Sequence, residues 1–222
     1  MLSSDVGSLR AALAQSLAPE AARRPRALFE EMNPHLVGDA RFEKRWTATR
    51  REAAVLVAIL ERGLSGAGSP SVLLTVRAHD MPSHAGQVSF PGGRIEPDDS
   101  GPVDAALREA REETGLAPDR VDVVGALGVH MGGRGFAVTP VVGLVEDPGD
   151  LRACPREVAE IFEAPVDFLF DLKNHRAERR AHQGVDYNVC AAPYGDYDIW
   201  GLTAGILKSL VETLEEAAEP AL

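Results

Sequence analysis

Three glutamates, Glu109, Glu112 and Glu113, occur close together in a short segment with helix-forming residues. Residues three and four positions apart are neighbours on a helix, so the three carboxylates are expected to share one face. Like charges at this spacing repel each other unless something offsets them. Divalent cations such as magnesium bind oxygen ligands and commonly lie between carboxylates and substrate phosphates. The segment therefore predicts a metal-dependent site for phosphate chemistry.

Glycines flank these glutamates on both sides. Gly92 and Gly93 precede them in the string Phe-Pro-Gly-Gly, and Gly115 follows at the point where a helix readily ends in a left-handed residue. Glycine also lets the backbone come close to a ligand. Taken alone, Arg-Glu-x-x-Glu-Glu is typical of a solvated helix face with exposed ion pairs, which contribute only about 0.3–0.5 kcal/mol each. From these residues alone, both the metal site and the solvated helix face remain possible.

This segment resembles the Nudix box, Gly-x5-Glu-x7-Arg-Glu-U-x-Glu-Glu-x-Gly-U, in which U is a bulky aliphatic residue. The second half matches at every specified position except Ala110, a small residue where a larger aliphatic one is usual. In the first half, Gly93 precedes Arg108 by fifteen positions rather than fourteen, so the loop carries one inserted residue. The first Glu is therefore absent or replaced: counting forward reaches Asp99 and counting back reaches Ser100.

The residues before the box resemble a second motif, found in the coenzyme A pyrophosphatase branch of the family: Leu-Leu-Thr-x-Arg-[Ser/Ala]-x3-Arg-x3-Gly-x3-Phe-Pro-Gly-Gly. The matching residues are Arg77, Ala78, Gly86, Phe90, Pro91, Gly92 and Gly93. Pro82 stands in place of the second arginine, so a phosphate held by that arginine needs another cation here. The inserted loop residue and the string Ile-Trp-Gly-Leu-Thr-Ala near the C-terminus also resemble this branch. The resemblance covers about residues 50 to 210.

The Nudix resemblance implies a fold and a metal site. The fold is α/β, an α/β/α sandwich with a mixed β-sheet, in which the box forms a loop–helix–loop. The implied cofactor is Mg2+ or Mn2+, and the expected ligands are Glu109, Glu112, Glu113 and the carbonyl of Gly93. Arg108 is expected to position these glutamates through ion pairs.

The general base stays open between three carboxylates, Glu109, Glu157 and Glu160. The branch has a similar Glu-Val step near Glu157, which favours that residue. The alternative is that Glu157 and Glu160 lie in the solvated first turn of a helix, where the helix dipole favours acids. In either case, a metal ion polarises the phosphoryl oxygens and lowers the pKa of a bound water.

Four residues before the box are predicted to contact substrate: Arg77, His84, Gln87 and Gly92. Arg77 either binds a substrate phosphate or pairs with a nearby acid. His84 and Gln87 either line the pocket or serve the loop structurally. Gly92 leaves space for a ligand to approach the backbone.

The overall composition is that of an ordinary globular protein. The chain has 222 residues, 45% of them hydrophobic and 26% charged. Its formal net charge of -11 opposes non-specific binding to nucleic acid, which requires a basic surface. The two cysteines, Cys154 and Cys190, lack metal-type spacing and are expected to be reduced and buried. The expected partner is a CoA-like nucleotide, and the sequence leaves a homodimer open.

The chain lacks signals for membrane insertion or export. It contains no run of eighteen apolar residues, and its N-terminus lacks a basic start followed by an apolar stretch. We therefore expect no membrane association and a cytoplasmic location. Residues 1–50 are predicted to form an N-terminal helical extension packed on the core, and residues 51–222 to form the Nudix hydrolase domain.

Hydrophobic patterning predicts the elements that must position the site. Strands are expected at Ala53–Leu60, in the centre of the sheet, and at Ser71–Arg77, Val121–Val129, Phe136–Val145 and Val185–Ala191. Helices are expected at Val6–Ala18, Pro102–Glu113, Glu157–Phe162 and Leu202–Glu216. Short turns are expected at Pro91–Gly93 and around Phe168.

Three functions agree with these patterns. The first is a coenzyme A pyrophosphatase, which splits CoA or its thioesters into 3′,5′-ADP and 4′-phosphopantetheine or its acyl form. The second is a Nudix hydrolase of another nucleoside diphosphate derivative, such as ADP-ribose or NADH. The third is a catalytically silent nucleotide-binding sensor, which would be expected to have lost metal ligands; all three box glutamates are present here.

Overall fold

The fold is seen in a computed structural model of the full chain. The structure describes residues 6–17, 28–37, 39, 51–62, 68–81, 84–132, 135–182 and 184–218. Pro82 and the larger part of residues 1–50 lie outside these ranges.

A mixed β-sheet forms the centre of the molecule. Its central strand, β1 (Arg51–Leu60), is parallel to β7 (Phe136–Val145) and antiparallel to β2 (Ser71–Arg77) and β4 (Gly92–Arg94). The other strands of this sheet are β3 (Val88–Ser89), β5 (Asp122–Ala126), β6 (His130–Met131) and β8 (Val158–Pro165). The central position predicted for β1 is confirmed. A strand buried on both faces is uniformly apolar, as β1 is over most of its length.

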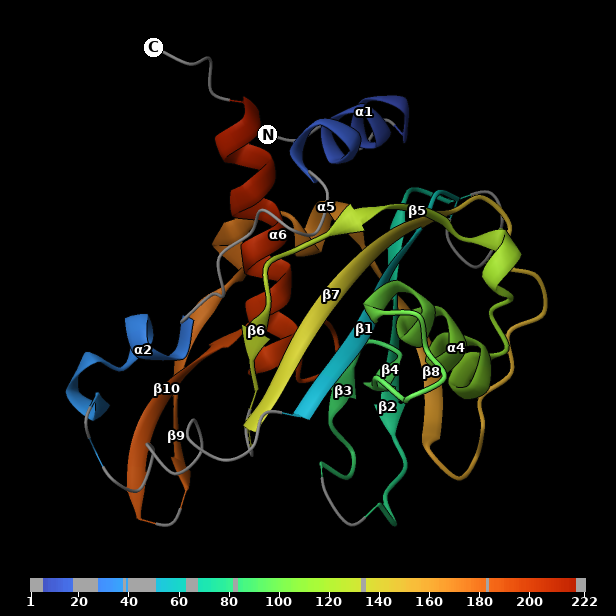
Figure 1. The fold of residues 1–222 in the computed structure, drawn as a ribbon. Helices are drawn as coiled ribbons and strands as arrows, with labels where there is room; N and C mark the ends of the chain where they lie inside the picture. Colours follow the sequence, from blue (N-terminus) through green and yellow to red (C-terminus); the bar gives the residue numbers. More distant parts are fainter. Residues whose placement is uncertain are drawn as a thin grey trace.

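Helices cover both faces of the sheet (Figure 1). On one face lies α4 (Pro102–Thr114), and on the other lie α6 (Leu202–Ala218), α5 (Val166–Leu169) and α1 (Val6–Ser16). The predicted α/β/α sandwich with a mixed sheet is confirmed. A hairpin of β9 (Arg176–His182) and β10 (Val185–Ala191) forms a separate sheet, with α2 (Leu28–Met32) beside β10. Three short 3-10 helices, η2 (Pro34–Leu36), η3 (Pro118–Arg120) and η5 (Leu172–Asn174), complete the described elements.

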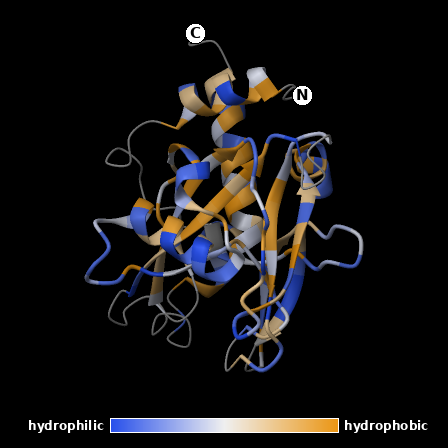
Figure 2. Cartoon of the chain, turned by 90° about the vertical axis from the view of Figure 1, so that its right-hand side faces the viewer, coloured by the Kyte–Doolittle hydropathy of each residue, from blue (hydrophilic) through white to orange (hydrophobic). Residues whose placement is uncertain are grey.

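Alternate residues of β1 belong to two different hydrophobic clusters, one on each face of the sheet. Leu56 and Ala58 pack with the alanines of α4, while Val57 and Ile59 pack with α6 and α1. Figure 2 shows hydrophobic residues concentrated along the strands between the two helical layers. We call these sides of the sheet the α4 face and the α6 face. The α4 face carries the candidate site.

The N-terminal helix α1 contributes to the larger cluster. Leu9 and Leu13 are buried in it, and α1 lies against α6 and β5. The division into an extension (residues 1–50) and a catalytic domain stays a prediction. Within the described ranges, no helix has the length and apolar character needed to cross a membrane.

Several predicted elements were wrong. The helix predicted over Glu157–Phe162 is strand β8, which pairs antiparallel with β2. From Ile161 on, half-buried and buried residues alternate, as in a strand, and the pairing with β2 overrides helix propensity. The strand predicted from 121 to 129 is shorter and is followed by β6, and the charged strand β9 was not predicted.

The turn predicted at Pro91–Gly93 is largely strand β4. A Cβ atom at Gly92 would lie 2.5 Å from the carbonyl oxygen of Ala54, so only glycine allows β4 to lie this close to β1. Cys154 is half-buried, contrary to expectation, whereas Cys190 is buried as predicted, and both thiols are free.

Candidate active site

The end of helix α4 carries the acidic cluster. The helix begins at Pro102, whose fixed φ suits the first helical position, and stops at Gly115 with φ 76°. The Gly115 N–H donates to the carbonyl of Arg111, which confirms the left-handed end predicted from the sequence. The glutamates therefore occupy the last two turns, next to strand β4.

Arg108 joins the loop before the helix to these glutamates. Its guanidinium donates to both carboxylate oxygens of Asp99, at 2.9 and 3.0 Å, and to the carbonyl of Arg94 at 3.0 Å. Another nitrogen of the group lies 3.0 Å from Glu109 and 3.4 Å from Glu112. The hydrogen bonds from Arg108 lower the pKa of Asp99. Such two-pronged pairs fix geometry as well as contribute energy.

These contacts indicate which residue corresponds to the first Glu of the box. Asp99 contacts Arg108, whereas Ser100 hydrogen-bonds to Asp104 on the first turn of the helix. The inserted residue therefore falls after Asp99 in the loop, and the aspartate binds the box arginine.

Glu113 is the most deeply buried of the box glutamates. It is 3% exposed and accepts a hydrogen bond from the Gly92 N–H at 3.2 Å. Burial raises the pKa of Glu113 to about 7, and the charges of Glu109 and Glu157 act in the same direction. The Gly92 hydrogen bond and the positive charge of Arg77 oppose this rise. A cation at Glu113 would offset the cost of holding a buried negative charge.

Glu109 lies directly on the backbone of β4. A Cβ atom at Gly93 would lie 2.3 Å from Oε1 of Glu109, so a larger residue at this position would displace the carboxylate. Burial also raises the pKa of Glu109. Two partly desolvated carboxylates beside a bare glycine strand provide oxygen donors of the kind that Mg2+ and Mn2+ prefer.

The three carboxylates do not form a finished metal cage. In the described ranges, no three His, Cys, Asp or Glu side chains lie together in a metal-ligand arrangement. Arg108 holds Glu109 and Glu112, and the Glu112 side chain is 54% exposed. Glu112 would therefore have to turn inward to share a cation with Glu109 and Glu113.

Arg77 reaches the α4 face from the end of β2. The Nε atom of Arg77 is buried and has no hydrogen-bond partner in the described part of the chain. Its charge acts on Glu113. A buried N–H donor without an acceptor is costly, so an acceptor supplied by a ligand would be favourable here.

The loop before β3 folds back onto Arg77. The Arg77 N–H donates to the carbonyl of Gln87 at 3.0 Å, and the Gln87 Oε1 lies 2.7 Å from Nδ1 of His84. His84 has φ 60°, an unusual conformation for a non-glycine residue. His84 and Gln87 thus bind each other and brace the loop. Their contact with substrate stays a prediction.

The structure separates the two later base candidates. The backbone carbonyl of Glu157 accepts from the Ala78 N–H at 2.9 Å, and its charge raises the pKa of both Glu109 and Glu113. Glu160 instead accepts from the Tyr197 hydroxyl at 2.5 Å. The Tyr197 ring stacks on Phe162, which belongs to the cluster on the α6 face. Glu157 is thus close to the box, and Glu160 lies across the sheet from it.

The comparisons with known proteins agree with the box geometry. The family model of the NUDIX domain matches residues 49–183. An uncharacterized Nudix hydrolase, NudL of Enterobacter sp. (strain 638), is 39% identical over 161 residues, covering 72% of this chain and 81% of the relative. This chain belongs to the Nudix family. NudL of Citrobacter koseri is 36% identical over 182 residues, covering 82% of this chain and 88% of the relative.

Solved Nudix structures resemble the chain more distantly. A NUDIX hydrolase from Nitrosomonas europaea has a TM-score of 0.47 at 17% identity, covering 78% of this chain and 76% of that one. Family membership therefore rests on the family model and the sequence relatives. Nudix hydrolases generally use divalent metal ions, which agrees with the carboxylate chemistry of α4.

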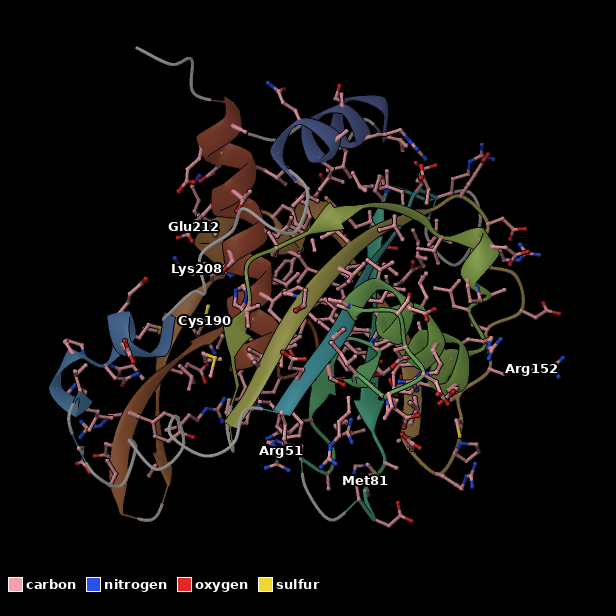
Figure 3. The ribbon with its side chains drawn as sticks, viewed as in Figure 1. Arg51, Met81, Arg152, Cys190, Lys208 and Glu212 are labelled. Carbon is pink, nitrogen blue, oxygen red and sulfur yellow. The ribbon has the colours of Figure 1, made fainter. Side chains whose placement is uncertain are left out.

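Residues 152–154, which hold the chain before Glu157 against the end of α4, were not recognised from the sequence. The Arg152 N–H donates to the carbonyl of Thr114 at 2.8 Å, and the Cys154 N–H donates to that of Glu113 at 2.9 Å. These bonds satisfy carbonyls left without partners at the helix end. Figure 3 shows Arg152 beyond that end, with its side chain directed outward. Backbone donors of this kind leave no residue-type signal.

Proposed function

We propose that this Nudix hydrolase splits the pyrophosphate bond of coenzyme A or its thioesters, with Mg2+ or Mn2+ as cofactor. The observation that carries the proposal is Arg77. It matches the arginine of the CoA pyrophosphatase motif, and its buried Nε lacks an acceptor beside Glu113. A substrate phosphate is an acceptor of the required charge.

The metal would be held by Glu109, Glu113 and Gly93, with Glu112 turning inward from its exposed position. When bound, it would polarise the phosphoryl oxygens and acidify a water. Arg108 positions the carboxylates by holding Glu109 and the box loop together.

Arg77 orients the substrate by donating to a phosphate oxygen. Glu157 is the base that the geometry favours, because it is exposed and acts electrostatically on both Glu109 and Glu113. It would take a proton from the attacking water as oxygen bonds to phosphorus. The opposite phosphate leaves, so that CoA and water yield 3′,5′-ADP and 4′-phosphopantetheine.

A second candidate is hydrolysis of ADP-ribose or NADH. Pro82 favours it, because it removes the second arginine of the CoA motif. The same carboxylates and Arg77 would act on the pyrophosphate of these compounds, so the two candidates differ in substrate recognition alone.

Incubation of the protein with CoA, ADP-ribose or NADH, each with Mg2+ or Mn2+, tests the proposal. Mass spectrometry should find 3′,5′-ADP from CoA formed much faster than AMP from the other two. Activity on ADP-ribose with CoA intact would replace the substrate and keep the chemistry. Metal binding without turnover of any of the three would favour the sensor. Glu113→Gln serves as the inactive control. Glu216→Gln makes the same substitution at an exposed position of α6 and serves as the matched active control.

A further inference from the structure

Two arginines gather around one aromatic ring at the end of the sheet near the box. The guanidinium carbon of Arg51 lies 4.6 Å from the ring centre of Phe136, and that of Arg94 lies 5.8 Å from it. The residues come from the start of β1, the end of β4 and the start of β7. We call these three residues the aromatic–arginine cluster.

Strand register places the cluster on the α6 face. Arg51 pairs with Phe136, and Arg94 pairs with Ala53, two residues from Arg51 on the same strand. Residues two apart on a strand share a face, and Val57 and Ile59 identify this one as the α6 face. The cluster therefore lies on the side of the sheet opposite α4. Arg51, labelled in Figure 3, lies at the lower end of β1.

Strand β4 lies between the cluster and the candidate metal site. Gly93 faces Glu109, and the next residue, Arg94, faces the opposite side. Among the described strands, β4 pairs with β1 alone, so its other edge carries no strand. Arg108 holds the carbonyl of Arg94 and so ties the position of the cluster to the box. A substrate with two anionic parts would have to pass this edge to reach both sides.

The charge of Arg94 calls for an anion. Both arginines are exposed, and Arg94 makes no ion pair with a described residue, although the chain has a net charge of -11. Two guanidinium groups at one ring repel each other. A guanidinium stacked on a ring still presents N–H donors at its edge, and these fit phosphate oxygens in pairs.

We propose that the aromatic–arginine cluster binds the adenosine 3′-phosphate end of the substrate. Arg94 and Arg51 donate to the phosphate monoester, and Phe136 with the stacked guanidinium provides a flat surface for adenine. This inference rests on the proposed function, since CoA carries a 3′-phosphate that ADP-ribose and NADH lack. The guanidinium groups of the cluster would also replace the motif's second arginine, where this chain has Pro82.

The test compares CoA with 3′-dephospho-CoA. In Arg94→Gln, KM for CoA should rise about tenfold, the loss expected for a charged hydrogen-bonding partner. KM for dephospho-CoA and kcat for both substrates should stay unchanged. Arg51→Gln should act in the same direction. Arg62→Gln is the matched control, because Arg62 lies just past the opposite end of β1 and pairs with Glu146.

A binding measurement separates this inference from the proposed function. Calorimetry should show that the wild type binds adenosine 3′,5′-bisphosphate more tightly than AMP. Arg94→Gln should bind these two ligands with equal affinity. This result would support the cluster even in a protein that leaves CoA intact. Equal effects of Arg94→Gln on CoA and dephospho-CoA, or no effect on either, would overturn the inference while leaving CoA hydrolysis standing.

Discussion

Replacing Glu113 by glutamine should stabilise the metal-free protein at pH 8. Burial raises the pKa of Glu113 from 4.5 to about 7 in the folded state. A carboxyl with a raised folded pKa contributes stability that is present below pH 4.5 and lost as pH rises through about 7. At about 1.4 kcal/mol per pKa unit, this interval corresponds to about 3 kcal/mol.

Glutamine keeps the shape and can still accept the Gly92 N–H, but it carries no charge. Its buried amide N–H groups cost part of the gain, so we expect a net increase of about 2 kcal/mol in the free energy of unfolding. For a chain of this size, that is about 5 °C in Tm.

Urea unfolding followed by circular dichroism, in EDTA at pH 5 and pH 8, measures this effect. The wild type should lose stability relative to Glu113→Gln between these two pH values, while Glu216→Gln should follow the wild type. Added Mg2+ or Mn2+ at a hundredfold over Kd should restore about 2.7 kcal/mol to the wild type and little to Glu113→Gln. A variant that is no more stable than the wild type at pH 8 without metal would refute the assignment of a buried charge.

Four further substitutions test the other parts of the site. Glu157→Gln should lower kcat by about a hundredfold, as expected on losing a general base, whereas Glu160→Gln should retain activity. Similar losses of kcat for both variants in steady-state assays would contradict the placement of Glu157 and Glu160 on opposite sides of the sheet. Gly93→Ala should displace the Glu109 carboxylate and weaken metal binding, measured by calorimetry, and unchanged affinity would contradict the contact. Arg108→Lys cannot reproduce the two-pronged pair with the box-loop aspartate and should lower kcat without a matching change in KM; a change in KM alone would assign Arg108 to substrate binding.

Local patterns predicted much of the framework. Strands β2, β7 and β10 begin and end as expected, because apolar and β-branched runs bounded by turn residues depend little on distant contacts. Helix α4 begins at the predicted residue and ends one residue later than predicted, because the proline at its start and the glycine after its end are local signals. The order of strands in the sheet follows from pairings between distant segments, which single-sequence patterns do not contain.

Several features of the site depend on such distant contacts. Gly92 and Gly93 were recognised as ligand-facing, but their role as a strand against β1 depends on the Ala54 backbone. Asp99 could not be chosen over Ser100 from spacing, because the choice lies in its reach to Arg108 across the loop. The raised pKa of Glu113 likewise depends on burial by segments far away in the sequence.

The base candidates show how one secondary-structure error changes a chemical conclusion. On the predicted helix, Glu157 and Glu160 are three positions apart and would share a face, so both would remain candidates. In a strand, side chains alternate, and residues an odd number of positions apart point to opposite sides. Because β8 begins at Val158, Glu160 binds Tyr197 on the α6 face, while Glu157 stays at the strand's start beside the box. The pairing of β8 with β2 therefore favours Glu109 and Glu157 over Glu160, and the identity of the base stays a prediction. Of these two, only Glu157 has no ion pair with Arg108 to give up.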